Sequence, residues 1–207
     1  MFLWVSIIID AKREDLHGKH SGDHMRLFRP GQTISADSSL IDVIHILTLQ
    51  RYGFITVLGE VAGYFSRNDI NKPVVRMWLF GIITFIEMEV LKIIIKHFPD
   101  DSWKSAITDK RLELASKLQQ ERERRGQQST LLDCLQFSDK AKILISKQET
   151  MEEIGLGSRS SAKKVIKEIE SLRNNLSHAQ DIVTYDWAQI VRITQRLQET
   201  FELNTTI

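Results

Sequence analysis

The stretch "MWLFGIITFIEMEVLKIIIKHF", from Met77 to Phe98, decides the fold. It is long and apolar, but it carries Glu87, Glu89 and two lysines, and each of these charges is costly in the hydrocarbon of a membrane. We therefore predict a central helix that is buried in the fold or in an oligomer interface, and we predict that it does not span a membrane.

The chain that follows Pro73 has the apolar spacing of helices throughout. The breaks "PDD", "GQQS" and "GLGSRS" each offer proline or glycine beside residues that cap helices. The predicted helices cover residues 74–98, 101–125, 130–145, 158–178 and 185–203. We expect residues 73–207 to form an all-α helical bundle.

The chain before Asn71 has a different pattern. The stretch "SSLIDVIHILTLQRYG" has helical spacing, and two short apolar runs, "FITVL" and "VAGYF", flank a turn at "GE" as in a hairpin. The opening "MFLWVSIIID" indicates a buried strand, because it is too short to span a bilayer and lacks the flanks of a signal peptide. Residues 1–72 are thus expected to form a small α/β segment, and the fold class is mainly α.

Composition sets the broad class of the protein. With 207 residues, 42% of them hydrophobic and 27% charged, the chain can bury a sizeable core. With a formal net charge of +1, the protein as a whole has no strong electrostatic attraction to nucleic acid. Binding of RNA therefore requires a local patch of basic residues. The run "ERERR" is typical of a solvated helix face. A single cysteine, Cys134, excludes an internal disulfide and favours the cytoplasm.

The stretch "SLRNNLSHAQD", from Ser171 to Asp181, places arginine, two asparagines and histidine where alanine, leucine, glutamate and lysine would make a better helix. Apolar residues at 4-3-4 spacing define the core side of this helix, and they are Val165, Ile169, Leu172 and Leu176. Asn174 and His178 then fall together on the outer side. The lysines of that side, Lys163 and Lys167, fit either a phosphate-binding surface or an ordinary solvated face.

The residue types in this stretch suit RNA cleavage without a metal. Such cleavage needs a base for the ribose 2′-hydroxyl proton, and the imidazole of His178 is the side chain most often used for that task. It also needs a donor for the charge on phosphorus, which Arg173 supplies as a bidentate fork, while Asn174 can donate and accept. Arg173 and His178 lie about 140° apart on a regular helix, so a site shared between two symmetry-related copies is predicted.

The run "RNNLSH", Arg-Asn-x-x-x-His near the end of a late helix in a small all-α bundle, resembles the motif of HEPN (higher eukaryote and prokaryote nucleotide-binding) ribonucleases. The resemblance covers residues 74–207. It implies a homodimer with a composite active site that cleaves RNA without a metal or other cofactor, in a toxin- or defence-like setting. Carried over, the catalytic residues are Arg173, Asn174 and His178.

The stretch "GYFSRND", from Gly63 to Asp69, follows the predicted hairpin and precedes a helix. A serine three residues before an aspartate at this point suits phosphate and ribose contacts, and it equally suits simple capping of the helix. The order of a helix, two strands and then the pattern G-h-h-S-x-x-D, in which h is a hydrophobic residue, resembles a cystathionine-β-synthase-type (CBS) motif. The resemblance covers residues 30–73. The resemblance implies an adenine nucleotide as a regulator, held by Ser66 and Asp69. Residues 1–29 are too short for the usual first copy, so this half is expected to be truncated.

Three other features have mainly structural interpretations. The loop with His17, His20, Asp23 and His24 fits an exposed polar turn better than a metal site, and no metal is predicted. Glu87 and Glu89 lie in the central helix, where a buried carboxylate is expected to hold Arg173 or to pair with a lysine. One apolar series is expected to form core or dimer interface, and its members are Trp187, Ile190, Thr194, Leu197 and Phe201.

Three functions remain open from the sequence. The first is a dimeric endoribonuclease whose CBS-like half modulates it. The second is a regulatory protein that senses an adenine nucleotide. The third is a dimeric scaffold, including one half of a toxin and antitoxin pair. The expected partners are RNA, a second copy of the chain, and an antitoxin or regulatory protein, with no membrane.

Overall fold

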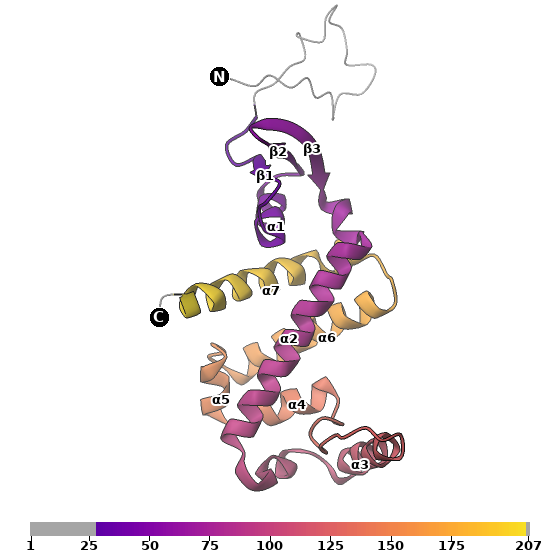
Figure 1. Cartoon of the computed structure of the whole chain (residues 1–207). Helices are drawn as coiled ribbons and strands as arrows, with labels where there is room; N and C mark the ends of the chain where they lie inside the picture. Colours follow the sequence, from indigo (N-terminus) through magenta and orange to yellow (C-terminus); the bar gives the residue numbers. More distant parts are fainter. Residues whose placement is uncertain (1–27, 206–207) are drawn as a thin grey trace, which may run out of the picture. The chain divides into compact units, whose positions relative to one another are not determined.

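The computed structural model describes the backbone of residues 28–205 and the side chains of residues 28–197. The predicted N-terminal strand and the cluster of His17, His20, Asp23 and His24 lie outside these residues. The described chain is mainly helical and has a small three-stranded sheet in its N-terminal part (Figure 1). The mainly α class with a small α/β segment is therefore confirmed.

The chain forms two compact units. One contains the residues up to Val75 together with those from Ile190 onward, and the other is Arg76–Gln189. The division into domains at residues 1–72 and 73–207 stays a prediction. None of the helices in the described part of the chain is long and apolar enough to cross a membrane.

The sheet of the first unit has the strand order β1-β2-β3. Strand β1 (Thr33–Ser35) runs parallel to β2 (Tyr52–Val57), which pairs antiparallel with β3 (Glu60–Ser66). Helix α1 (Leu40–Leu49) connects β1 to β2. The predicted helix and hairpin are confirmed, whereas β1 was missed because three residues are too few to show a period.

Local interactions explain these elements. The Ser39 hydroxyl accepts from the backbone N–H of Asp42, and the Asp42 carboxylate accepts from the backbone N–H of Ser39. This reciprocal pair is a capping box, and it satisfies two backbone N–H groups that have no partner within α1. The hairpin turns at Leu58 and Gly59, whose φ angles of 51° and 84° are the left-handed pair of a two-residue turn. Gly53 on β2 leaves room for the ring of Phe65, since an added Cβ would lie 2.3 Å from it.

The rest of the chain is helical. The elements are η3 (Arg67–Asn71), α2 (Pro73–His97), η4 (Pro99–Ala106), α3 (Asp109–Arg124), α4 (Phe137–Leu144), α5 (Gln148–Glu153), α6 (Arg159–Ser177) and α7 (Ile182–Thr205). The helices predicted over 74–98, 158–178 and 185–203 are confirmed within a few residues at each end.

The single helix predicted over 101–125 is wrong, because the structure divides it. Asp100 and Asp101, inside the short 3-10 segment η4, adopt left-handed φ angles of 54° and 59° directly after Pro99. Trp103 in that segment is buried, and a new helix starts at Asp109. The burial of Trp103 favours the break between η4 and α3. The spacing of apolar residues did not reveal this burial, because it depends on tertiary packing.

The helix predicted over 130–145 is correct only from residue 137 onward. The Asp133 carboxylate accepts from the backbone N–H and the hydroxyl of Thr130. These local hydrogen bonds compete with a helix and stabilise the turns of residues 131–135. The buried side chains there are Leu132, Cys134 and Leu135, at a spacing that does not suit one helix face. Cys134 is therefore a packing residue of the core.

The second unit buries one face of α2 and the predicted stripe of α6. The buried residues of α2 include Leu79, Ile83, Val90 and Ile94, and those of α6 include Ile169, Leu172 and Leu176. Between α3 and α4, the Arg111 guanidinium donates to both carboxylate oxygens of Asp139, which is 1% exposed. Pairing of this kind is what makes a buried carboxylate tolerable.

Candidate functional site

Arg173 lies on α6 and is held from α2. Its Nε is 3.1 Å from Glu87 Oε1, and the Arg173 side chain is 45% exposed against 27% for Glu87. The expected pairing with Arg173 is therefore confirmed for Glu87, and the expected pairing with a lysine is confirmed for Glu89, whose Oε1 lies 2.6 Å from Lys92 Nζ. Glu87 Oε1 is buried and accepts no well-aligned hydrogen bond, so the contact is electrostatic.

The outer end of the Arg173 guanidinium is open. Among residues 28–197, no hydrogen bond engages its two terminal nitrogens. These nitrogens form the planar fork that binds phosphate in a bidentate manner. Glu87 thus holds the guanidinium at its inner nitrogen and leaves the fork available to an anion.

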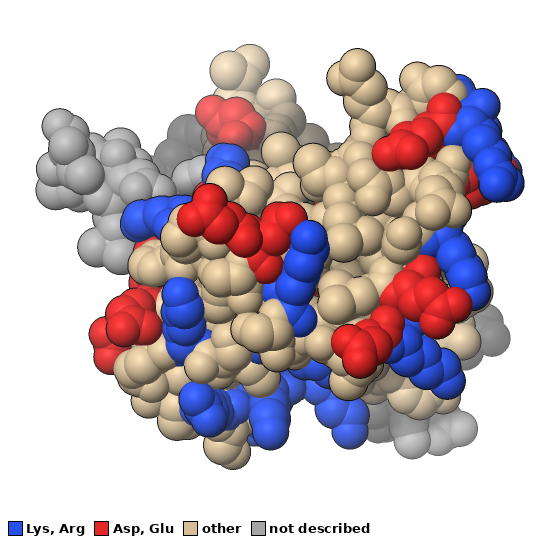
Figure 2. Space-filling model, turned by 90° about the horizontal axis from the view of Figure 1, so that it is seen from below, with Lys and Arg blue, Asp and Glu red and all other residues tan. Residues whose placement is uncertain are grey.

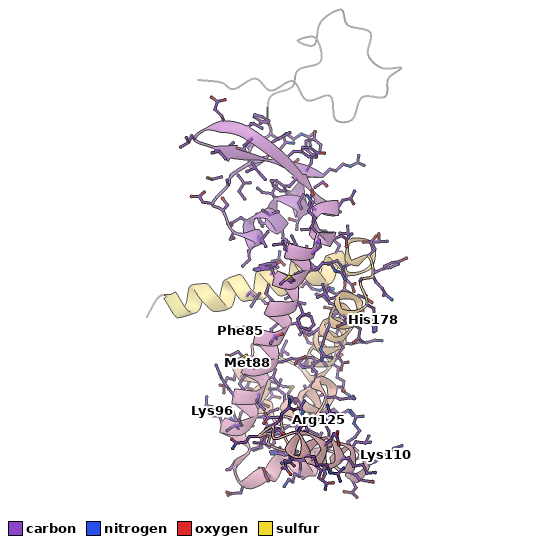
Figure 3. All side chains as sticks on the ribbon, turned by 45° about the vertical axis from the view of Figure 1, so that its right-hand side comes forward. Phe85, Met88, Lys96, Lys110, Arg125 and His178 are labelled. Atoms are coloured by element: carbon purple, nitrogen blue, oxygen red, sulfur yellow. The ribbon has the colours of Figure 1, made fainter. Side chains whose placement is uncertain are left out.

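Asn174 and His178 lie on the exposed side of α6, as their spacing predicts. Their backbones are linked, because the His178 N–H donates to the Asn174 carbonyl at 3.1 Å, but neither side chain has a partner within the described part of the chain. His178 is the C-cap of α6, and Ala179 after it adopts a left-handed φ of 53°. The histidine is therefore exposed at the end of a helix (Figure 3).

One chain does not bring the three predicted catalytic side chains together. Arg173 turns toward Glu87 of α2, whereas Asn174 and His178 are exposed on the other side of α6. Within the described residues, no hydrogen bond or ion pair joins any two of these three side chains. This arrangement agrees with the angular separation expected from the sequence.

An arginine of α2 that the sequence reading missed fixes the end of α6. Arg76 donates from Nη1 to the Gln180 carbonyl at 2.7 Å, and from Nη2 to the carbonyls of Asn175 and Leu176 at 2.9 Å each. The last carbonyls of a helix have no partner in the helix itself, so a guanidinium can satisfy them. No local pattern could reveal this contact, since about 100 residues separate the partners.

The second asparagine of the stretch has a structural use. Asn175 Nδ2 donates to Asp186 Oδ2 at 2.7 Å, and the Ser171 hydroxyl lies 3.5 Å from Asp186 Oδ1. Asp186 is 1% exposed and belongs to α7. Asn175 therefore links α6 to α7 by satisfying a buried carboxylate.

Ser66 and Asp69 contact each other at the start of η3. The Asp69 carboxylate accepts from the Ser66 backbone N–H at 2.7 Å and from the Ser66 hydroxyl at 3.1 Å, and Lys72 Nζ lies 2.6 Å from its other oxygen. Burial raises the pKa of Asp69, but the hydrogen bonds from Lys72 and Ser66 outweigh it and the pKa lies below its ordinary value. The capping interpretation is thus observed, and a nucleotide would have to displace these contacts.

Charged residues elsewhere are mostly paired with their neighbours. On α3, Lys117 pairs with Glu113, and Arg125 with Glu121, so much of the charge in and around "ERERR" is neutralised along one helix. On α6, Lys163 and Lys167 are exposed on the side of Asn174. Positive and negative side chains are interspersed over the face seen in Figure 2.

Within the described residues, no three His, Cys, Asp or Glu side chains are grouped as metal ligands. Comparisons of the chain with protein-family models, with curated proteins and with solved structures find no match. The resemblances to HEPN ribonucleases and to CBS motifs are therefore carried by the quoted residues alone.

Proposed function

We propose that the chain is a metal-independent endoribonuclease of HEPN type that acts as a homodimer with a composite active site. The observation that carries the proposal is the state of the three side chains at the end of α6. Arg173 is held at Nε by Glu87 while its outer nitrogens are open, and Asn174 and His178 are exposed and unpartnered among residues 28–197. All three side chains are therefore accessible to a phosphodiester from outside the chain.

The chemistry assigns one task to each side chain. His178 accepts the proton of the ribose 2′-hydroxyl, whose oxygen attacks the adjacent phosphorus. Arg173 stabilises the negative charge that develops on the phosphoryl oxygens, and Asn174 orients the phosphodiester by hydrogen bonds. The bond from phosphorus to the 5′-oxygen breaks, this oxygen takes up a proton, and the products are a 2′,3′-cyclic phosphate and a 5′-hydroxyl.

A second copy supplies what one chain lacks. Because Arg173 and His178 face different sides of α6, a phosphodiester cannot be contacted by both in one chain without reaching around the helix. A twofold axis near the end of α6 would place residues of both copies around one substrate. In this proposal the protein works in the cytoplasm as a toxin- or defence-like factor, with an antitoxin or regulatory protein as partner.

Cleavage of labelled RNA in EDTA tests the proposal. We expect the wild type to cut, and His178→Ala or Arg173→Ala to cut about 100- to 10,000-fold more slowly with the dimer intact. His45→Ala is the matched control, because His45 is an exposed histidine on α1 and its loss should leave the rate unchanged. A folded wild-type dimer that never cuts RNA would refute the enzyme and leave a dimeric scaffold.

Glu87→Gln tests the positioning of Arg173. The amide keeps the shape of the carboxylate but removes the charge that holds Arg173 Nε, so the cleavage rate should fall about 10- to 100-fold. Glu89→Gln is the control, since Glu89 pairs with Lys92 on the same helix. An equal effect of both variants would show that Glu87 acts only through general charge.

Regulation by an adenine nucleotide in the CBS-like half is a second candidate. It is supported by the juxtaposition of a hydroxyl, a carboxylate and an ammonium group at Ser66, Asp69 and Lys72. Calorimetry with ATP, AMP and S-adenosylmethionine should then give heat with the wild type and none with Asp69→Ala. Absence of heat with all three compounds would leave these residues as the cap of η3.

A further inference from the structure

Helix α2 is apolar on two opposite sides. One side is buried in the second unit through Leu79, Ile83, Val90 and Ile94. The other is exposed except at the half-buried Leu91, and a seam of residues at 4-3-4-3-4 spacing runs along it: Met77, Gly81, Thr84, Met88, Leu91 and Ile95. A contiguous apolar face that is exposed in one chain often marks an interaction surface, so this face is expected to have a partner.

The exposed apolar side chains are large. The exposed fractions are 74% for Met77, 42% for Phe80, 40% for Phe85, 53% for Met88 and 62% for Ile95. Phe85 and Met88 lie along α2 in Figure 3. Since a large apolar side chain can bury about 150–250 Å², these fractions amount to roughly 500 Å², more than half of what each partner buries in a standard interface.

Gly81 gives independent evidence for a close partner. It lies within a 25-residue helix, where glycine is among the poorest helix formers. Beyond the adjoining backbone of its own helix, no atom of the described residues lies within 4 Å of the place where its Cβ would be, so packing among these residues does not require a glycine. The missing side chain instead leaves a notch on the exposed seam that a bulky residue of another molecule can fill.

We propose that α2 of a second copy packs antiparallel on this seam, with the twofold axis near Thr84. This pairing is self-complementary, because the Gly81 notch of each copy receives Met88 of the other. The Thr84 hydroxyl at the centre already donates to the Phe80 carbonyl at 3.0 Å, so it brings no unmet donor into the interface. The length of the seam, about 27 Å from Met77 to Ile95, matches nearly three heptads.

The interface deepens the proposed function and rests on it for the role of Arg173. Glu87 precedes Met88 and flanks the seam. The twofold axis is perpendicular to the plane that contains the two α2 helices. A rotation about this axis does not move a residue from one side of that plane to the other. Both Glu87–Arg173 pairs therefore lie on the same side of the α2 pair. They are then within about 10 Å of each other along the helix axis. Each copy thus contributes one guanidinium fork to a shared phosphate-binding surface.

Sedimentation equilibrium of the full chain tests the seam. We expect a wild-type dimer, and at least 100-fold weaker association for Met88→Glu, which places a charge in the Gly81 notch. Leu114→Glu is the matched control, because Leu114 is 48% exposed on α3 and should not affect the dimer. A monomeric wild type, or a dimer unaffected by Met88→Glu, would overturn the proposal.

A mixing experiment tests the antiparallel register. Gly81→Lys fits the free chain, since the space at Gly81 is open, and should also be monomeric. An equimolar mixture of Gly81→Lys and Met88→Glu should form a heterodimer, because the lysine meets the glutamate at one notch while the native contact remains at the other. No association in the mixture would overturn the antiparallel pairing, as a parallel pair sets position 88 against position 88.

The outcomes separate the two proposals. A dimer that dissociates with Met88→Glu but never cuts RNA supports the seam and refutes the nuclease. RNA cleavage that persists in a dimer insensitive to Met88→Glu supports the nuclease and overturns the seam. A monomeric wild type that Met88→Glu destabilises to heat would mean that another part of the same chain covers this face.

Discussion

Two neighbouring asparagines of α6 have different environments. Asn174 is exposed and its side chain has no partner within the described residues, whereas Asn175 donates to the buried carboxylate of Asp186 at 2.7 Å. One side chain is free to meet a substrate, and the other satisfies a group that cannot reach water. The crowding of polar residues in this helix thus has two physical causes.

This difference leads to a paired prediction. Asn175→Ala removes the donor closest to Asp186, so the free energy of unfolding should fall by about 1.5–3 kcal/mol. Asn174→Ala should change the free energy of unfolding by less than about 0.5 kcal/mol, while slowing RNA cleavage. Urea denaturation and a cleavage assay on both variants measure the two effects. Equal destabilisation by both would contradict the assignment.

At the scale of elements, α2 organises the end of α6. Its first turn supplies Arg76 to the final carbonyls of α6, and about three turns further along the same side Glu87 holds Arg173. Both contacts come from one rigid helix. The end of α6, and with it the position of His178, is therefore set by a segment distant in the sequence.

We predict that Arg76→Ala frays the last turn of α6. Loss of three hydrogen bonds from a charged donor should lower the free energy of unfolding by about 2 kcal/mol and should also slow RNA cleavage, because His178 follows directly. Arg76→Lys should recover only part of the loss, since an ammonium group cannot span several carbonyls as a guanidinium does.

Hydrogen exchange can localise the effect of Arg76→Ala. Faster exchange should be confined to the last turn of α6, around residues 175–180, with the core stripe near Leu172 unchanged. Arg67→Ala is a useful comparison, because Arg67 caps the carbonyl of Leu47 at the end of α1 in the other unit. Faster exchange throughout α6 in Arg76→Ala would indicate general destabilisation instead of fraying.

At the scale of the whole molecule, the main consequence is association. A monomer that exposes the α2 seam should gain stability when a second copy covers it, so the melting temperature depends on protein concentration. For a chain of 207 residues, we expect each tenfold rise in concentration to raise the melting temperature by about 2 °C. Scanning calorimetry over a hundredfold range measures this.

The same experiment on Met88→Glu supplies the control. That variant should melt at one temperature at every concentration, because its folded state is already the monomer. A wild-type melting temperature that does not move with concentration would contradict dimerisation by any surface, including the α2 seam.

Much of the fold follows from local pattern. Strong periodicity over many turns marked α2, α6 and α7, and the glycine-containing turn marked the hairpin of β2 and β3. The predictions that were wrong, at residues 101–125 and 130–136, concern segments where burial of single residues such as Trp103 and Leu132 overrides the period. Strand β1 and helix α5 are too short for a pattern to reveal them.

The sequence by itself determined the mainly helical class, the core stripe of α6, and the outward position of Asn174 and His178, because these follow from spacing along one element. Only the tertiary structure decided that Glu87 holds Arg173, that Arg76 closes the end of α6 and that Asn175 serves Asp186. Each of these contacts joins residues that are neighbours only after the helices pack, so no local spacing can encode them.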